Sequence, residues 1–142
     1  MTNKDTMYII RCIALILRSI KLQRTIFVID DNDMNLTVAR EALKEQYRVI
    51  TIPSALKMFN HLEKVKPDII LLDVYMPDMD GFEALSNLKN NNEYKDIPVI
   101  FLTGTINSSI TERGYELGVV DFILKPFSKS DLIDKINSHL TE

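Results

Sequence analysis

The sequence predicts a doubly wound α/β fold, in which a five-stranded parallel sheet carries helices on both faces and an extra N-terminal apolar helix precedes it. Between residues 25 and 142, five segments rich in β-branched residues alternate with five segments of helical periodicity. This alternation favours a parallel sheet, because parallel neighbours need a helical crossover between them. Ligands bind such sheets at the carboxyl ends of the strands. The fold class therefore also predicts where a functional site lies.

The expected strands and helices follow one another at short intervals. Strands are expected at residues 25–30, 47–52, 68–73, 97–103 and 119–124, and helices at residues 33–46, 54–65, 82–90, 108–117 and 129–140. The first and third strands are continuous apolar runs, which is typical of strands buried on both faces. The loop "MPDMDG", residues 76–81, cannot continue the third strand, because Pro77 lacks a backbone donor and the Asp-Gly pair favours a turn.

Composition limits the classes of function. The 142 residues suffice for one ordinary domain with a sizeable core. Seventeen Lys and Arg against twenty Asp and Glu give a formal charge of −3, so direct nucleic-acid binding is not expected and partners should be proteins. The single Cys12 cannot form an internal disulfide, and no Cys/His cluster has the spacing of a zinc site. These features predict a cytoplasmic protein.

Residues 1–24 are expected to form a separate, helical N-terminal extension. Its apolar part, "MYIIRCIALILRSIKL", has sixteen residues interrupted by Arg11 and Arg18, fewer than the ~20 needed to span a bilayer. No transmembrane span is therefore expected. Lys4, Arg11 and Arg18 recur every seven residues and would form one polar stripe on an otherwise apolar helix, which needs a partner surface. Docking on its own domain, or on a second copy as a homodimer, is favoured over binding to a membrane surface.

Five polar residues are expected at the carboxyl ends of the strands. Asp30 and Asp31 end the first strand, Asp73 the third and Thr103 the fourth, and Lys125 follows the fifth. Three carboxylates at one edge repel one another unless a cation lies among them. Mg²⁺ suits such oxygen ligands and commonly binds together with phosphate oxygens. Thr103 and Lys125 supply the hydroxyl and the ammonium that hold a phosphoryl group, and the central Asp73 is the expected nucleophile.

Four motifs in order resemble the receiver domain of two-component response regulators, of the chemotaxis-regulator kind. They are "VIDDNDMN" (28–35), "LLDVYMPDMDG" (71–81), "FLTG" (101–104) and "DFILKPF" (121–127). The resemblance covers residues 25–141 and implies a receiver domain over residues 25–142. It also implies the flavodoxin-like strand order 2-1-3-4-5.

The resemblance implies a role for each site residue. Asp73 would accept a phosphoryl group from a histidine kinase or a histidine phosphotransfer protein, as the phosphoacceptor of a two-component or phosphorelay system. Mg²⁺ would be held by Asp31, Asp73 and the backbone carbonyl of Tyr75, with Asp30 acting through a water molecule. The chain would be no enzyme beyond accepting and hydrolysing its own phosphoryl group.

A switch pair is also implied by the resemblance. Phosphorylation would draw the hydroxyl of Thr103 inward, and the ring of Phe122 would follow and change the face formed by the fourth helix, fifth strand and fifth helix of the sheet series. Many members of the family carry Tyr where this chain has Phe122. A cis peptide bond is implied between Lys125 and Pro126. Tyr75 is bulky enough to shield an aspartyl phosphate from water.

Two other interpretations remain at this point. In a haloacid-dehalogenase-like phosphatase, Asp31 would be the nucleophile and Asp33 the general acid, but that reading leaves Asp73 and its loop without a role. Asp33 is otherwise expected to cap the helix at residues 33–46. In an interaction scaffold, the site would go unused. The cognate kinase, the target, the oligomeric state and whether the domain acts alone stay open.

Overall fold

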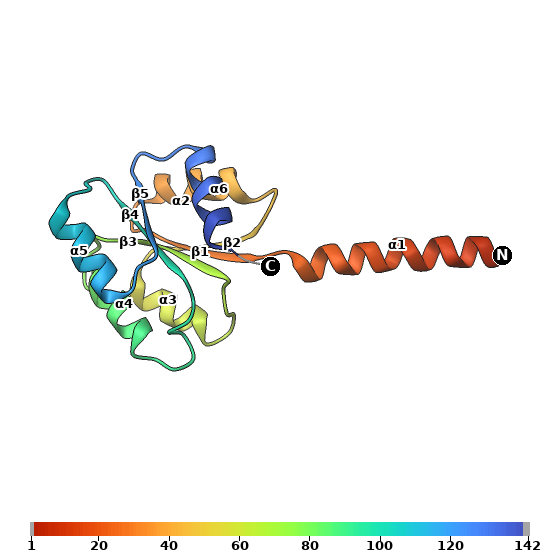
Figure 1. The fold of residues 1–142 in the computed structure, drawn as a ribbon, viewed down its shortest axis with the longest axis horizontal. Helices are drawn as coiled ribbons and strands as arrows, with labels where there is room; N and C mark the ends of the chain where they lie inside the picture. The colour runs from red at the N-terminus through yellow and green to blue at the C-terminus, as the bar shows by residue number, and fades with distance from the viewer. Residues whose placement is uncertain (1, 141–142) are drawn as a thin grey trace.

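The structure is a computed structural model that describes residues 2–140, apart from the side chains of residues 18–22. Its elements are α1 (Asn3–Leu22), β1 (Thr25–Ile29), α2 (Asp33–Leu43), β2 (Arg48–Ile52), α3 (Ala55–Leu62), β3 (Ile69–Asp73), α4 (Gly81–Lys89), β4 (Val99–Thr103), α5 (Ser108–Leu117), β5 (Asp121–Leu124) and α6 (Lys129–His139). From β1 onward, strands and helices alternate along the chain (Figure 1).

The strands form one parallel sheet in the order β2-β1-β3-β4-β5, which confirms the predicted fold class. The chain moves from β1 outward to β2 and then returns to β3 on the other side of β1. The carboxyl ends of β1 and β3 therefore flank the point where the winding direction reverses, which is where ligands bind in such sheets. Ile29 pairs with Leu72, so the residues that follow them emerge side by side.

Helices cover both faces of the sheet, with α2 and α6 on one face and α3, α4 and α5 on the other (Figure 1). Successive residues of β1 point to opposite faces, as the two-residue period of a strand requires. Phe27 and Ile29 join the core beneath α3, α4 and α5, whereas Ile26 and Val28 join the core beneath α2 and α6. Burial on both faces explains why β1, β3 and β4 read as continuous apolar runs.

The predicted boundaries differ from the structure mainly at helix ends. The helix expected at residues 33–46 ends at Leu43, and the expected role of Asp33 as its cap is wrong. Asn32 caps α2 instead, because its backbone is extended and its side chain accepts the backbone N–H of Asn35 at 3.1 Å. Asp33 occupies the first turn of α2, where its negative charge interacts favourably with the positive end of the helix dipole.

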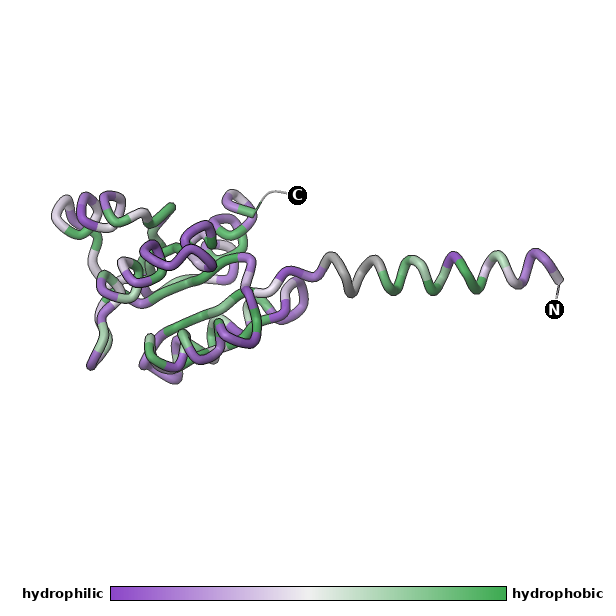
Figure 2. The backbone as a smooth tube through the Cα atoms, turned by 90° about the horizontal axis from the view of Figure 1, so that it is seen from below, coloured by the Kyte–Doolittle hydropathy of each residue, from purple (hydrophilic) through white to green (hydrophobic). Residues whose placement is uncertain are grey.

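Helix α1 extends away from the rest of the chain, to which Gln23 and Arg24 connect it (Figures 1 and 2). Of the two partner surfaces expected for this helix, its own domain is therefore wrong, and a second copy stays a prediction. Helical periodicity is a local property, whereas docking needs a complementary surface. Within residues 2–140 there is no helix with the length and hydropathy that a membrane span requires.

Candidate functional site

Three carboxylates meet at the carboxyl edge of the sheet. Asp30 and Asp31 follow β1, Asp73 ends β3, and an oxygen from each lies within 4.8 Å of the others. Asp30 and Asp73 are buried, with 0% and 4% of their surfaces exposed, whereas Asp31 is open to solvent. The structure thus brings together the acids predicted from separate strands, and leaves one of them accessible from outside.

Lys125 provides the positive charge of this cluster. Its Nζ lies 2.8 Å from Oδ1 of Asp73 and 2.9 Å from Oδ2 of Asp30. The backbone N–H of Lys125 donates to the carbonyl of Thr103 at 2.8 Å, so β4 and β5 deliver both residues to the same place. The bond between Lys125 and Pro126 is cis, as the resemblance implies. Burial acts to lower the pKa of Lys125, but its bonds to the two carboxylates raise it above the ordinary value.

Asp30 is held by the start of α2 as well as by Lys125. Its Oδ1 accepts the backbone N–H of Asn32 at 2.9 Å, and its Oδ2 accepts a hydrogen bond from the side-chain amide of Asn35 at 3.1 Å. These donors satisfy a carboxylate that has no exposed surface. The positioning role of Asn35 is not evident from the sequence. The only signal is an amide one turn into the helix that follows the acidic pair.

Asp73 has a pKa raised from 3.8 to about 6. Burial is the main cause, and the negative charges of Asp30 and Asp31 add to it, while the hydrogen bond from Lys125 acts in the opposite direction. The carboxyl group of Asp73 therefore changes charge close to neutral pH. A site that disfavours its own negative charge in this way is suited to bind a cation.

The raised pKa predicts an unusual pH dependence of stability in the absence of divalent cations. Between pH ~4 and pH ~6 the native state binds more protons at Asp73 than the unfolded state does, so stability from this group decreases as pH rises. The contribution of Asp73 to the free energy of unfolding should fall by about 2–3 kcal/mol across this window. Urea denaturation at a series of pH values measures it. In Asp73→Asn this component should vanish, and an unchanged pH profile in that variant would contradict the assignment.

Thr103 ends β4 at the same edge, with 1% of its surface exposed. Its hydroxyl donates to the carbonyl of Thr105 at 2.8 Å and accepts the backbone N–H of Thr105 at 3.2 Å. The hydroxyl is thus engaged in the turn that follows its own strand. The structure places Thr103 where the sequence predicts, but its hydroxyl is not bonded to Asp73 or Lys125.

The ring of Phe122 is buried, with 6% of the residue exposed. It packs edge-on against Phe101 and Tyr115, at centroid distances of 5.8 and 5.3 Å. Gly114 makes room for it, because a Cβ at that position would lie 2.7 Å from Cζ of Phe122. The sequence offers no signal for this role of Gly114, since a glycine inside a helix usually only lowers helix propensity. The ring of Phe122 therefore already points inward in this state.

Gly81 brings the start of α4 against the end of β3. A Cβ at Gly81 would lie 2.5 Å from the backbone oxygen of Asp73, too close for any side chain. Its N–H donates to the carbonyl of Val74 at 2.7 Å. The loop between β3 and α4 is thereby folded back beside the site. Tyr75, within this loop, has 60% of its surface exposed, and the metal-binding role of its carbonyl stays a prediction.

Comparison with known proteins identifies the family of the chain. The model of the response regulator receiver domain matches residues 26–137. A probable cyclic di-GMP phosphodiesterase of Vibrio cholerae is 36% identical over 118 residues, which cover 83% of this chain and 27% of that protein. The chain thus spans about a quarter of the length of that relative.

Two solved structures show the same likeness. The chemotaxis protein CheY4 of Vibrio cholerae superposes with a TM-score of 0.80 at 24% identity, covering 83% of this chain and 99% of that one, which supports the fold. The receiver domain of the sensor histidine kinase PA1611 of Pseudomonas aeruginosa, with magnesium coordinated in its active-site cleft, has a TM-score of 0.74 at 26% identity. That match covers 82% of this chain and 96% of the other. The chain therefore belongs to the response regulator receiver family and carries a phosphoacceptor domain of two-component signalling.

Proposed function

We propose that Asp73 is the phosphoacceptor and takes its phosphoryl group from a histidine kinase or a histidine phosphotransfer protein. The observation that carries this proposal is the buried carboxylate of Asp73 at the end of β3, 2.8 Å from Nζ of Lys125 and beside Asp30 and Asp31. A carboxylate oxygen of Asp73 forms the new bond to phosphorus as the bond from phosphorus to the donor histidine nitrogen breaks.

Lys125 and Thr103 receive the phosphoryl oxygens in this proposal. The ammonium of Lys125, now shared between two carboxylates, would neutralise one oxygen, and the hydroxyl of Thr103 would leave its turn and donate to another. Phosphoryl transfer needs mainly positioning and charge neutralisation of this kind. The ring of Phe122, already inward, would then be fixed in place by the rearranged Thr103.

The donor set fits Mg²⁺. Among the described residues the cluster holds three carboxylates, of which Asp30 and Asp73 share the ammonium of Lys125, and all of the candidate ligands are hard oxygen atoms. We assign the ion to Asp31, Asp73 and the backbone carbonyl of Tyr75, with Asp30 acting through water. Bound there, the ion would neutralise carboxylate and phosphoryl charge together.

The proposed output is a change in the face formed by α5, β5 and α6, read by a target protein. We propose no catalytic activity beyond transfer to Asp73 and its hydrolysis, and a cytoplasmic location where kinases can reach the site. The rival phosphatase lacks its general acid here, because Asp33 opens α2 and stands outside the group of acids found among the described residues.

A phosphotransfer profile tests the proposed function. The chain is incubated with Mg²⁺ and a panel of autophosphorylated histidine kinases and phosphotransfer proteins, and the loss of label from each donor is followed over time. Transfer to this chain from one donor, much faster than from the others, is the expected result. If neither a protein donor nor acetyl phosphate labels a folded chain, the function is that of a scaffold and the proposal is wrong.

Tyr75 is expected to lengthen the life of the phosphoryl group. Its side chain is exposed and stands two residues beyond Asp73, where it can cover the phosphoryl group against attacking water. Tyr75→Asn should shorten the half-life several-fold, measured as loss of label after the donor is removed. Tyr75→Phe keeps the ring and should leave the half-life nearly unchanged. Equal half-lives in Tyr75→Asn and the native chain would refute this role.

A further inference from the structure

Helix α1 exposes an unusual amount of apolar surface. Eight large apolar residues between positions 7 and 17 are 41–70% exposed, namely Met7, Tyr8, Ile9, Ile10, Ile13, Leu15, Ile16 and Leu17. The helix projects from the domain along its whole length (Figures 1 and 2). Exposed apolar patches of this extent mark interaction surfaces. This surface is separate from the phosphoacceptor site, because α1 leads into the amino end of β1 while Asp30 and Asp31 follow its carboxyl end.

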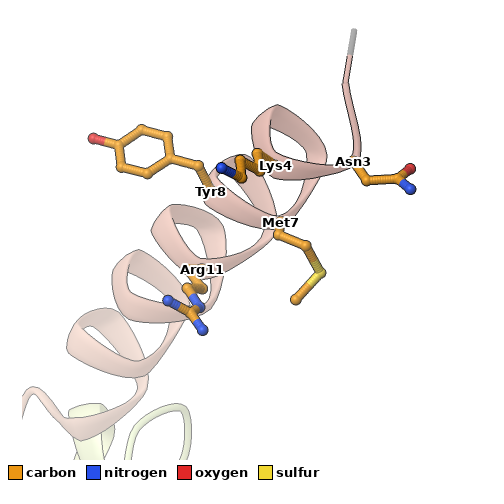
Figure 3. Close-up of a pocket in the computed structure, with 5 residues that line it drawn as sticks. All are labelled: Asn3, Lys4, Met7, Tyr8 and Arg11. Atoms are coloured by element: carbon orange, nitrogen blue, oxygen red, sulfur yellow. The ribbon is translucent and has the colours of Figure 1, made fainter.

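The side chains of α1 follow a seven-residue repeat. Thr6, Ile9, Ile13 and Ile16 recur at intervals of three, four and three residues, which places them along one side of the helix. On the other side, Lys4 and Arg11 lie seven residues apart and line a shallow hollow with Asn3, Met7 and Tyr8 (Figure 3). Apolar residues that alternate at intervals of three and four form the contact row by which helices wind around each other. In the sequence, Ile20 continues the isoleucine row, and Arg18 continues the seven-residue spacing of Lys4 and Arg11. The side chains of Ile20 and Arg18 lie outside the described part of the chain.

The positions that flank this row are suited to a second copy of the same helix. In coiled coils, charges at the flanking positions select a partner or reject one. Here those positions hold Asp5, Ile10, Cys12 and Leu17, which carry no repeated charge. Lys4 and Arg11, the basic residues whose side chains the structure describes, lie on the opposite side of α1 from the isoleucine row (Figure 3), so there two copies can meet without opposing like charges. The isoleucine row can therefore pack against the same row of a second copy, and these flanking residues do not favour a different helix as the partner.

The charge distribution disfavours an anionic membrane as the covering surface. Helix α1 contains four basic residues and one acidic residue, so the rest of the chain carries a net charge of −6 within the total of −3. Only Gln23 and Arg24 separate α1 from β1. An anionic surface that attracted the helix would therefore hold an acidic domain close against itself, which is unfavourable.

We propose that α1 pairs with α1 of a second copy of this chain, with Ile9, Ile13 and Ile16 forming the buried contact row. The two helices would meet along roughly 30 Å, the length of a twenty-residue helix. Pairing there joins copies at the edge of the sheet opposite Asp73 and leaves the phosphoacceptor site open. The proposal therefore does not depend on the proposed phosphoryl transfer.

Sedimentation equilibrium of the full chain, over a wide concentration range, tests this pairing. The native chain should be oligomeric, and Ile13→Lys should weaken association by at least about tenfold, because a lysine would be buried in the contact row. Leu15→Lys is the matched control, since it adds the same charge on the side that carries Lys4 and Arg11. It should associate like the native chain. Circular dichroism and the rate of phosphorylation, which should be unchanged in both variants, verify that the domain remains folded.

Three results would overturn the proposal. The native chain could be monomeric at all concentrations, or both lysine variants could weaken association equally, which would indicate non-specific apolar contact. In the third, a monomeric native chain co-sediments with vesicles of phosphatidylglycerol and phosphatidylcholine, and Ile13→Lys abolishes that binding. The membrane would then be the surface that covers α1.

Discussion

Replacing Asp73 with asparagine is expected to abolish phosphorylation of the chain, by at least about a thousandfold in rate, because the amide cannot act as the nucleophile. The fold should persist. Asparagine has nearly the same size, and removing the carboxylate of Asp73 removes both the cost of burying its charge and its repulsion by Asp30 and Asp31. Labelling by acetyl phosphate and by a cognate kinase, both with Mg²⁺, measures the effect.

Asp78→Asn is the matched control for this experiment. It makes the same chemical change five residues further on, in the loop between β3 and α4, where Asp78 is exposed and lies outside the acidic cluster. Its backbone has a positive φ of 69°, which asparagine tolerates well. Phosphorylation should continue at the native rate in Asp78→Asn. Stable labelling of Asp73→Asn at a native rate would exclude residue 73 as the acceptor.

Replacing Lys125 with methionine should have the largest effect on stability. It leaves Asp30 and Asp73, both buried, without the ammonium that now lies 2.9 and 2.8 Å from them. Removing one partner of a buried ion pair typically costs about 3–5 kcal/mol, because an uncompensated charge stays behind. We expect a loss near the lower value at neutral pH, since Asp73 can take up a proton. Urea denaturation without divalent cations measures it.

A control variant and a measurement with Mg²⁺ accompany the experiment on Lys125→Met. Lys129→Met, at the exposed start of α6, removes a solvated ammonium and should change stability by less than about 0.5 kcal/mol. Millimolar Mg²⁺ should recover part of the stability lost in Lys125→Met by replacing the missing positive charge. A loss below about 1 kcal/mol in that variant would mean that Lys125 does not stabilise the buried acids.

The fold and the core of the site could be predicted because they depend on patterns local to the sequence. Continuous apolar runs identify β1 and β3, and the parallel arrangement then brings their carboxyl ends, with Asp30, Asp31 and Asp73, to one edge. Thr103 and Lys125 follow from the same argument, since each stands at or just beyond the end of a strand.

The remaining features depend on contacts between distant parts of the chain. The helix expected at residues 33–46 ends at Leu43. Tyr47, expected to begin the second strand, precedes β2 instead, and its hydroxyl donates to the side chain of Asn137 on α6. Asn35 and Gly114 matter only through their neighbours, Asp30 and Phe122. The direction of α1 was not predictable either, because an apolar helix indicates a partner surface without identifying it.

The most direct test is to identify the residue that carries the phosphoryl group. The chain is phosphorylated in the presence of Mg²⁺ and treated with borohydride, which reduces an acyl phosphate to the corresponding alcohol, and its peptides are then sequenced by mass spectrometry. Our account predicts reduction at residue 73 and at no other carboxylate. Reduction at residue 30 or 31, with residue 73 unmodified, would contradict it.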